Sequence, residues 1–406
     1  MEEAAERLEE LKDRARRRLL DDPSLFEASD AQRRLHLREV LRQLLEDDGV
    51  LVPAVRLAAL VREISDEVLG LGRVEMLLRD PTVTEVLINS PEDIYVEQAG
   101  RLQRAEIQLD SQAQILHLVE RVIGPLGLRL DESRPFVEAR LPDGSRLHAI
   151  IPPLAVHGPV VTIRRFATHP FTLASLVANG TLSEEMASFL HRAVRMGLNI
   201  VVSGGTGSGK TTLLNVLSGS IPTQERVITI EETAELRLAR SHVVSLEARP
   251  PNIEGKGEVT VRDLLRNALR MRPDRIVVGE VRGAEALDML QALNTGHRGS
   301  LTTCHANSPK HLLARLETLV MMAGMGMSTE PLRQQIAAAL HLAVHMARLS
   351  DGSRKVVKIT EVSGLGEDGL ALVDLFRFRE IGRSAQGGIE GAFECLGPPP
   401  VLGMQE

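Results

Sequence analysis

Residues 199–212 read NIVVSGGTGSGKTT, and the rest of the chain is organised around this stretch. A short β-branched run leads into a glycine-rich turn ending in Lys210, and residues 211–220 continue with helical spacing. The turn fits G-x-x-x-x-G-K-[ST], in which backbone N–H groups cradle phosphates, the lysine reaches the β/γ-phosphates and the hydroxyl ligates magnesium. The sequence therefore predicts a site for the phosphates of a nucleotide and for Mg²⁺, made by Gly205, Thr206, Gly207, Ser208, Gly209, Lys210, Thr211 and Thr212.

Composition narrows the possible classes of protein. The 406 residues suffice for two or three domains, and the net charge of −7 argues against a basic nucleic-acid-binding surface. With no Trp and one Tyr, the chain lacks platforms for stacking bases. Two distant cysteines form no disulfide framework, the N-terminus is acidic, and no run of 18 apolar residues occurs. We expect a cytoplasmic protein that binds no nucleic acid and does not insert directly into a membrane.

Periodicity divides the chain into four regions. Residues 1–75 have helical spacing, whereas 76–168 are rich in strand patterns with one helix near 111–126, which predicts a small α+β domain. From 169 to 380, short unalternating apolar strands alternate with helices, a pattern typical of a parallel α/β sheet covered on both faces. Residues 381–406 are rich in Gly and Pro and predict an irregular tail.

Polar residues follow three of the predicted parallel strands, where ligands of such sheets collect. Glu280 follows the strand at 275–279 and is a candidate to hold magnesium, with helix capping as the alternative. Glu231 and Glu232 follow the strand at 227–230, and one of them, with Glu231 preferred, is a candidate to orient the attacking water. His305 ends the strand near 300–303 as a candidate γ-phosphate sensor or a structural histidine.

Arginines are dense just before the second large domain, at 140, 146, 164 and 165. Arg164 and Arg165 are neighbours on one predicted strand, so their side chains point to opposite faces and at most one faces a given ligand. Spacing leaves open which one does so. Surface solubility is the alternative for each arginine.

Four ordered segments resemble the ATPase superfamily of type II and type IV secretion: GGTGSGKTT (204–212), ITIEETAEL (228–236), LRMRPDRIVVGEVRGAEA (269–286) and TGHRGSLTTCHANSP (295–309). Residues 141–166 and 249–274 resemble most closely the CpaF/TadA branch, which powers assembly of tight-adherence pili. The similarity extends over about residues 65–380. It departs at Glu232, where aspartate is common in the superfamily.

The resemblance implies a RecA-like C-terminal domain behind a PAS-like N-terminal domain, with ATP held between them. It implies a homo-hexamer that is peripherally associated with the inner membrane through platform proteins. By position it assigns phosphate and magnesium contacts to Lys210 and Thr211, the metal-side acid to Glu280, and the water-orienting acid to Glu231 or Glu232. It assigns the histidine-box position to His305 and the phosphate-reaching arginines to Arg164, with Arg146 and Arg165 as neighbours.

Two other readings remain at this stage. A RecA-like helicase or recombinase shares the phosphate loop, although the acidic charge and scarce aromatics oppose it. A nucleotide-gated scaffold with little turnover would also need the loop, although the acids at 231 and 280 argue for hydrolysis.

Overall fold

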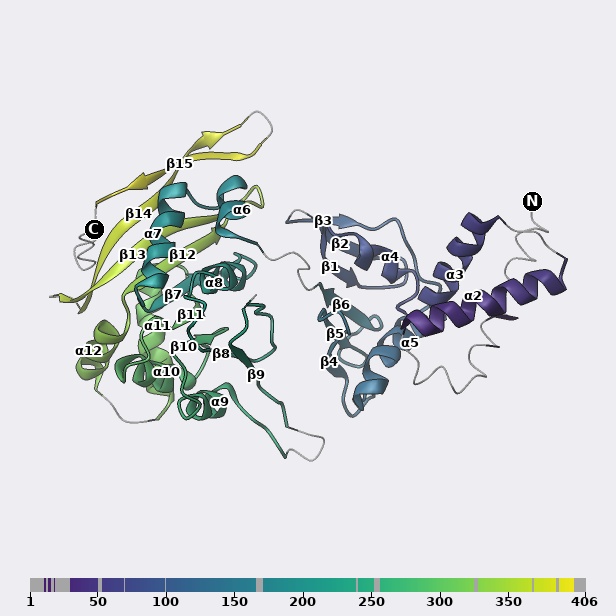
Figure 1. Ribbon diagram of the computed structural model, residues 1–406, viewed down its shortest axis with the longest axis horizontal. Helices are drawn as coiled ribbons and strands as arrows, with labels where there is room; N and C mark the ends of the chain where they lie inside the picture. Colours follow the sequence, from purple (N-terminus) through teal and green to yellow (C-terminus); the bar gives the residue numbers. More distant parts are fainter. Residues whose placement is uncertain are drawn as a thin grey trace. The chain divides into compact units, whose positions relative to one another are not determined.

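The computed structural model describes residues 11, 14, 15, 18, 30–49, 53–68, 70–98, 100–165, 171–238, 240–251, 256–324, 328–366, 369–384 and 387–397. The chain divides into two compact units, residues 1–168 and 169–406 (Figure 1). Most of residues 1–29, the domain boundary at 168/169 and the last residues of the tail lie outside the described residues. No helix in the described part of the chain is long and apolar enough to cross a bilayer.

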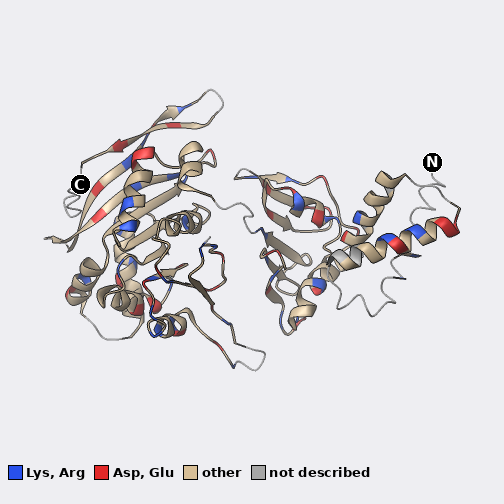
Figure 2. Cartoon of the chain, viewed as in Figure 1, with Lys and Arg blue, Asp and Glu red and all other residues tan. Residues whose placement is uncertain are grey.

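The first unit combines helices with an antiparallel sheet in the order β3-β2-β1-β6-β5-β4. Leucines of the two N-terminal helices pack together in one cluster, and the core of the sheet is separate. Basic and acidic residues are mixed along α2, as expected for a solvated helix (Figure 2). The elements are α2 (Asp30–Asp47), α3 (Ala54–Val68), α4 (Val74–Arg79), β1 (Val83–Ile88), β2 (Ile94–Gln98), β3 (Arg101–Arg104), α5 (Gln112–Ile123), η2 (Gly124–Leu126), β4 (Phe136–Arg140), β5 (Arg146–Ile150) and β6 (Val160–Arg164).

The second unit contains a nine-stranded sheet in the order β15-β14-β13-β12-β7-β11-β10-β8-β9. The strands from β9 to β12 in this order are parallel, and those from β12 to β15 are antiparallel. The elements are α6 (Leu173–Ala178), α7 (Glu184–Arg195), β7 (Ile200–Gly204), α8 (Lys210–Ser218), β8 (Val227–Glu231), β9 (Val243–Glu247), α9 (Val261–Ala268), β10 (Arg275–Val278), α10 (Glu285–Asn294), β11 (Leu301–His305), α11 (Pro309–Met322), α12 (Thr329–Ala339), β12 (Leu342–Arg348), β13 (Arg354–Gly366), β14 (Gly369–Arg383) and β15 (Ile389–Cys395).

Both faces of the parallel region are buried. On β7, Ile200 and Val202 pack with α6, α7 and α8, whereas Val201 packs with α9 to α12. Successive residues of a strand point to opposite faces, so a continuous apolar run is needed when helices cover both. The predicted fold class, an α/β unit with a parallel sheet and phosphate loop, is confirmed.

Three strands differ from the prediction. Neither β9 nor β12 was predicted, and the expected irregular tail from residue 381 is wrong where β14 runs to Arg383 and β15 pairs with it. Gly391 lies under the ring of Phe378, where a Cβ would be 2.3 Å from Cζ, so the position requires glycine. Glycine is uncommon in strands, and its presence makes this strand hard to predict from the sequence. The Phe378 and Phe393 rings then pack at 5.0 Å between centroids, which holds the strand to the sheet.

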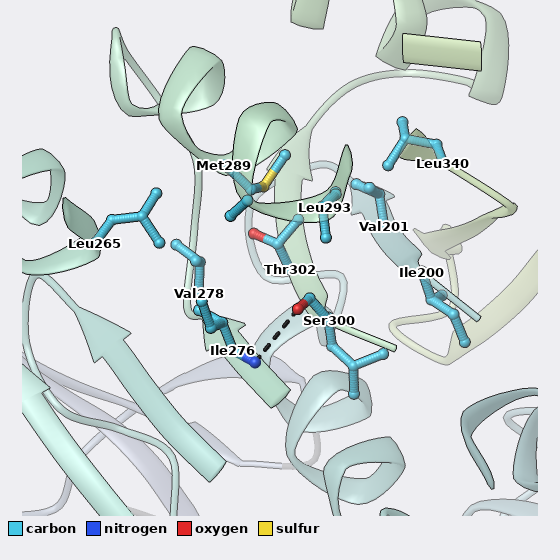
Figure 3. A pocket seen from close by; sticks show the side chains of 12 residues that line it. Ile200, Val201, Leu265, Ile276, Val278, Met289, Leu293, Ser300, Thr302 and Leu340 are labelled. Carbon is cyan, nitrogen blue, oxygen red and sulfur yellow. Dashed lines mark hydrogen bonds between the residues drawn. The ribbon is translucent and has the colours of Figure 1, made fainter. Parts of the chain in front are cut away.

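A small cavity lies in the core of the second unit, beneath the parallel strands. Its wall is mostly apolar, with Val201, Val278, Met289 and Leu293 among the lining side chains and the Ser300 hydroxyl at its edge (Figure 3). The Ser300 Oγ atom accepts a 3.3 Å hydrogen bond from the Ile276 amide. The space open to the centre of a water molecule is about 10 Å³, enough for about one water. A nucleotide does not fit there.

Candidate active site

The phosphate loop joins β7 to α8, and its glycines are required by the backbone. Gly204 has φ 156°, and a Cβ there would lie 2.4 Å from the carbonyl oxygen of Met346 and 2.6 Å from Ser208 Oγ. Gly209, at φ 95°, is the N-cap of α8 and supplies no side-chain cap to the helix. The N-terminus of α8 is thus of the kind that binds phosphate, with backbone N–H groups directed at the anion.

Lys210 lies inside this loop and is only 7% exposed. Its Nζ donates a 3.0 Å hydrogen bond to the carbonyl oxygen of Gly205, which also accepts the hydroxyl of Ser208 at 2.9 Å. A buried ammonium that is bonded to a neutral backbone carbonyl can exchange this partner for a phosphate oxygen, which binds it more strongly because it is charged. Thr211 and Thr212, the next two residues, are half-buried in the first turn of α8.

The carboxyl ends of β7, β11, β10 and β8, which are neighbours in the sheet, place the other candidates together. His305 Nε2 lies 3.4 Å from Lys210 Nζ and 3.0 Å from Glu280 Oε1. The other Glu280 oxygen accepts a 2.6 Å hydrogen bond from Arg282, whose second amino group pairs with Glu232 at 2.9 Å. One chain of contacts thus runs from the loop lysine through histidine to two acids.

Burial lowers the pKa of His305, and the charges of Lys210 and Arg282 lower it further against the opposing effect of Glu280. A neutral imidazole at neutral pH can accept at Nε2 from the lysine or donate from Nε2 to Glu280, but not both at once. Glu280 Oε1 is buried and accepts no hydrogen bond of good geometry from the described residues. A buried carboxylate oxygen that lies beside a phosphate loop, with the imidazole of His305 at 3.0 Å, fits a magnesium ion or its bound water.

Glu231 has a different environment from the rest of this cluster. Its side chain is buried, and its carboxylate accepts hydrogen bonds from the amides of Glu235 at 2.9 Å and Leu236 at 3.1 Å and 3.2 Å. Burial raises the pKa of Glu231 to about 7, although the two amides oppose the shift. Both oxygens are directed to the following turn, so the contacts favour Glu232 over Glu231 as the solvent-facing acid of the pair.

The candidate arginines belong to the first unit. Arg146 of β5 and Arg164 of β6 are register partners and share one face of the sheet, with Arg140 of β4 next in the same row. Arg164 is 56% exposed and lies 3.5 Å from Glu85. Arg165 instead donates to the backbone carbonyls of Asp80 and Val83, the latter at 2.8 Å. Arg165 therefore differs from Arg164, because backbone carbonyls hold its guanidinium whereas Arg164 lies near a carboxylate.

Sequence reasoning missed Arg282, which links Glu280 to Glu232. Its position two residues after the strand-end acid was the available signal. It also missed His345 of β12, whose Nδ1 lies 2.9 Å from Ser203 Oγ at the end of β7. Burial lowers the pKa of His345 to about 4, so this side chain is neutral under the loop. The nearly continuous apolar run of residues 342–347 would have identified its strand.

Comparison with known proteins identifies the family of the chain. Residues 67–380 match the family described as type II/IV secretion system protein. A putative conjugal transfer protein of Mycobacterium tuberculosis is 38% identical over 341 residues, which cover 79% of this chain and 96% of that protein. The type IV secretion system protein VirB11 of Brucella suis is 33% identical over 296 residues, 66% of this chain and 82% of its own.

A solved structure gives an independent comparison of the fold. The Legionella pneumophila ATPase DotB superposes with a TM-score of 0.51 at 24% identity, covering 70% of this chain and 78% of that one. Similarity at this level of identity concerns the fold alone. The family match extends over most of the chain, including the phosphate loop, both acidic segments and His305. The chain therefore belongs to the type II/IV secretion system protein family.

Proposed function

We propose that this protein is an ATP-hydrolysing motor of pilus assembly or secretion. The observation that carries the proposal is the continuous line of contacts from Lys210 through His305 and Glu280 to Arg282 and Glu232, at the carboxyl ends of neighbouring strands. A phosphate loop alone predicts binding. A loop whose lysine shares a histidine with a buried acid has, in addition, groups suited to hydrolysis.

The residues present fit ATP and magnesium. Lys210 and the backbone of residues 205–209 would hold the phosphates, and Thr211 and Glu280 would hold the metal. Magnesium supplies neutralisation of the charge on the phosphate oxygens. The buried Glu280 Oε1, an anionic oxygen close to the phosphate loop, is the feature of this chain that supports the metal assignment.

Within the acidic pair, we assign orientation of the attacking water to Glu232. This carboxylate is 57% exposed, and Arg282 holds it at 2.9 Å. Glu231 is assigned to holding the turn 232–236, because its oxygens already accept the two amides there. His305 then acts as a neutral donor or acceptor that responds to the position of Lys210.

Arg146 and Arg164 are assigned to the same site from the first unit. They are neighbours on one sheet face, so both can approach one anion, whereas Arg165 is retained by Asp80 and Val83. An arginine carried on a movable domain completes a nucleotide site only when the domains close, which couples hydrolysis to motion. The assignment includes a homo-hexamer, in which that motion is repeated around a ring.

The names of the relatives refer to conjugal transfer and to type IV secretion, which supports a role for this protein in a process of that kind. The finer assignment to tight-adherence (CpaF/TadA-type) pili rests on residues 141–166 and 249–274. It includes cytoplasmic location and peripheral attachment to inner-membrane platform proteins. Deleting the gene should abolish surface pili, and complementation with wild type but not with Glu280→Gln should restore them. Normal piliation in the deletion strain would reject the tight-adherence assignment.

The enzymatic proposal is tested with Glu280→Gln, which keeps the shape of the side chain and removes its charge. Turnover should fall by about 100-fold or more with ATP still bound, because the acid acts on the reacting end and not on the base or ribose. Glu330→Gln on α12, an exposed acid in the same unit, is the matched control and should turn over like wild type. Wild-type turnover in Glu280→Gln would reject the proposal.

A further inference from the structure

A hairpin braces the phosphate loop and lies outside the phosphate-loop motif. The hairpin consists of the end of β12, the turn 349–353 and the start of β13. Arg354 Nε donates a 2.9 Å hydrogen bond to the carbonyl oxygen of Gly207, at the centre of the loop. Arg348, its register partner across the hairpin, places Nη1 3.5 Å from where a Cβ of Gly207 would lie.

The same hairpin contacts the other positive-φ glycines of the loop. The carbonyl oxygen of Met346 lies against Gly204, where a Cβ would meet it at 2.4 Å. The Met346 methyl and Arg354 Cδ lie 3.3 Å and 3.5 Å from the Cβ position of Gly209. The approach of the Met346 oxygen needs the absence of a side chain at Gly204, so this glycine serves the hairpin as well as the ligand.

The bond to Gly207 has a consequence for the next amide. In a trans peptide the C=O and the following N–H point in opposite directions, so a carbonyl directed to Arg354 turns the N–H of Ser208 to the inner side of the loop. There it makes only a 3.5 Å contact with the oxygen of Gly205. A poorly satisfied inward N–H is what a bound phosphate oxygen completes.

The hairpin is itself held rigidly. Asp351 accepts the amide and hydroxyl of Ser353 at 2.9 Å and 2.7 Å, and it accepts the amide of Ile389 from β15 at 2.7 Å. These hydrogen bonds lower the pKa of Asp351 to about 2, so its carboxylate remains charged throughout the neutral range. The C-terminal strand is thereby connected to the turn that carries both arginines.

We propose that Arg354, supported by Arg348, is a positioning residue for the nucleotide: it fixes the Gly207–Ser208 peptide so that the Ser208 amide faces the phosphates. The inference rests on the proposed function, since it concerns the same loop. It assigns Arg354 no contact with the reacting atoms. Arg354 therefore affects the affinity for the nucleotide, whereas the acids determine the rate of the chemical step.

The test uses the full chain with Arg354→Met, which keeps the apolar stem against Gly209 and removes the donors. The Kd for MgADP and the KM for MgATP should rise about tenfold, and kcat should change less than threefold. Amide exchange in residues 204–212 of the nucleotide-free protein should accelerate. Arg377→Met on β14, whose arginine pairs with Glu394 at 2.6 Å, is the matched control and should behave as wild type.

A second variant separates position from charge. Arg354→Lys keeps the charge without the Nε donor and should also bind MgADP weakly; full wild-type affinity in this variant would overturn the proposal. Unchanged MgADP affinity and unchanged loop exchange in Arg354→Met would overturn it too, as would a lower Tm as the sole change. If the Met variant fails to fold, the Lys variant decides by the same measurements. If the wild-type protein binds MgADP but does not hydrolyse ATP, the proposed motor function is refuted, and the positioning role of Arg354 is still decided by the affinities of its variants. If the wild-type protein binds no MgADP, both proposals are overturned.

Discussion

Glu231→Gln should make the second unit more stable at pH 8 while leaving ATP turnover within about threefold of wild type. Burial gives the Glu231 carboxyl a folded-state pKa of about 7 against an ordinary value of 4.5. Between these pH values the folded protein keeps a proton that the unfolded chain releases, so stability falls as pH rises from 4.5 to 7. At 1.36 kcal/mol per pH unit, the carboxylate costs about 3 kcal/mol above pH 7.

Replacing Glu231 by glutamine removes the cost of burying a carboxylate and keeps the hydrogen bonds accepted by one of the two side-chain oxygens. Its Oε1 can still accept the amides of Glu235 and Leu236, whereas its NH₂ replaces the oxygen that lies 3.2 Å from the Leu236 amide. Losing this bond costs about 1 kcal/mol, which leaves a net gain of about 2 kcal/mol at pH 8. For a unit of this size the Tm should rise by about 4 to 8 °C.

The assay is urea unfolding of the full chain at pH 5 to 8, followed by amide exchange in β8 and β10, which reports on the second unit alone. The Glu231→Gln protein should lose the decline in stability between pH 4.5 and 7. Glu258→Gln, an exposed acid of the same unit, should keep the wild-type profile. A Gln variant that is no more stable at pH 8 would refute the desolvation argument, and turnover reduced about 100-fold would return the water-orienting role to Glu231.

The remaining predictions concern the two units separately. Arg165→Ala should destabilise the first unit by about 2 kcal/mol in urea unfolding, because two backbone carbonyls lose their hydrogen-bond donor. Arg164→Ala should change the stability by less than about 0.5 kcal/mol and should lower ATP turnover. Equal stability of the two variants would contradict this prediction. Gly299→Ala should destabilise the second unit by at least about 2 kcal/mol, since φ is 75° and the new Cβ would fall 1.2 Å from Nη1 of buried Arg275. A wild-type Tm for Gly299→Ala would show that Arg275 relocates at no cost.

The parallel core was predictable because its signal is local. Each of the strands ending near 204, 230, 279 and 303 is a continuous apolar run, and polar strand ends in a parallel sheet meet at one edge. From this alone Lys210, Glu280 and His305 were expected together, and their distances of 3.0 to 3.4 Å agree.

The parts that were not predictable depend on tertiary contacts. The strand β15 was not predicted because it contains Gly391, and the ring of Phe378 on the neighbouring strand occupies the space of a side chain at that position. The environment of Glu231 was not predictable for a similar reason, because spacing does not show that the next turn folds back and supplies amides to its carboxylate. Arg354 lies 147 residues from the carbonyl it holds, a relation that no local pattern reports.

The measurement that tests the central claim most directly is magnesium-dependent ATP hydrolysis by the assembled full-length chain, wild type against Lys210→Ala. Lys310→Ala, an exposed lysine on α11, serves as the control. We predict turnover in wild type and in the control that requires Mg²⁺, and a loss of about 100-fold or more in Lys210→Ala. Equal turnover in Lys210→Ala and wild type, or no turnover in the assembled wild type, would contradict the account.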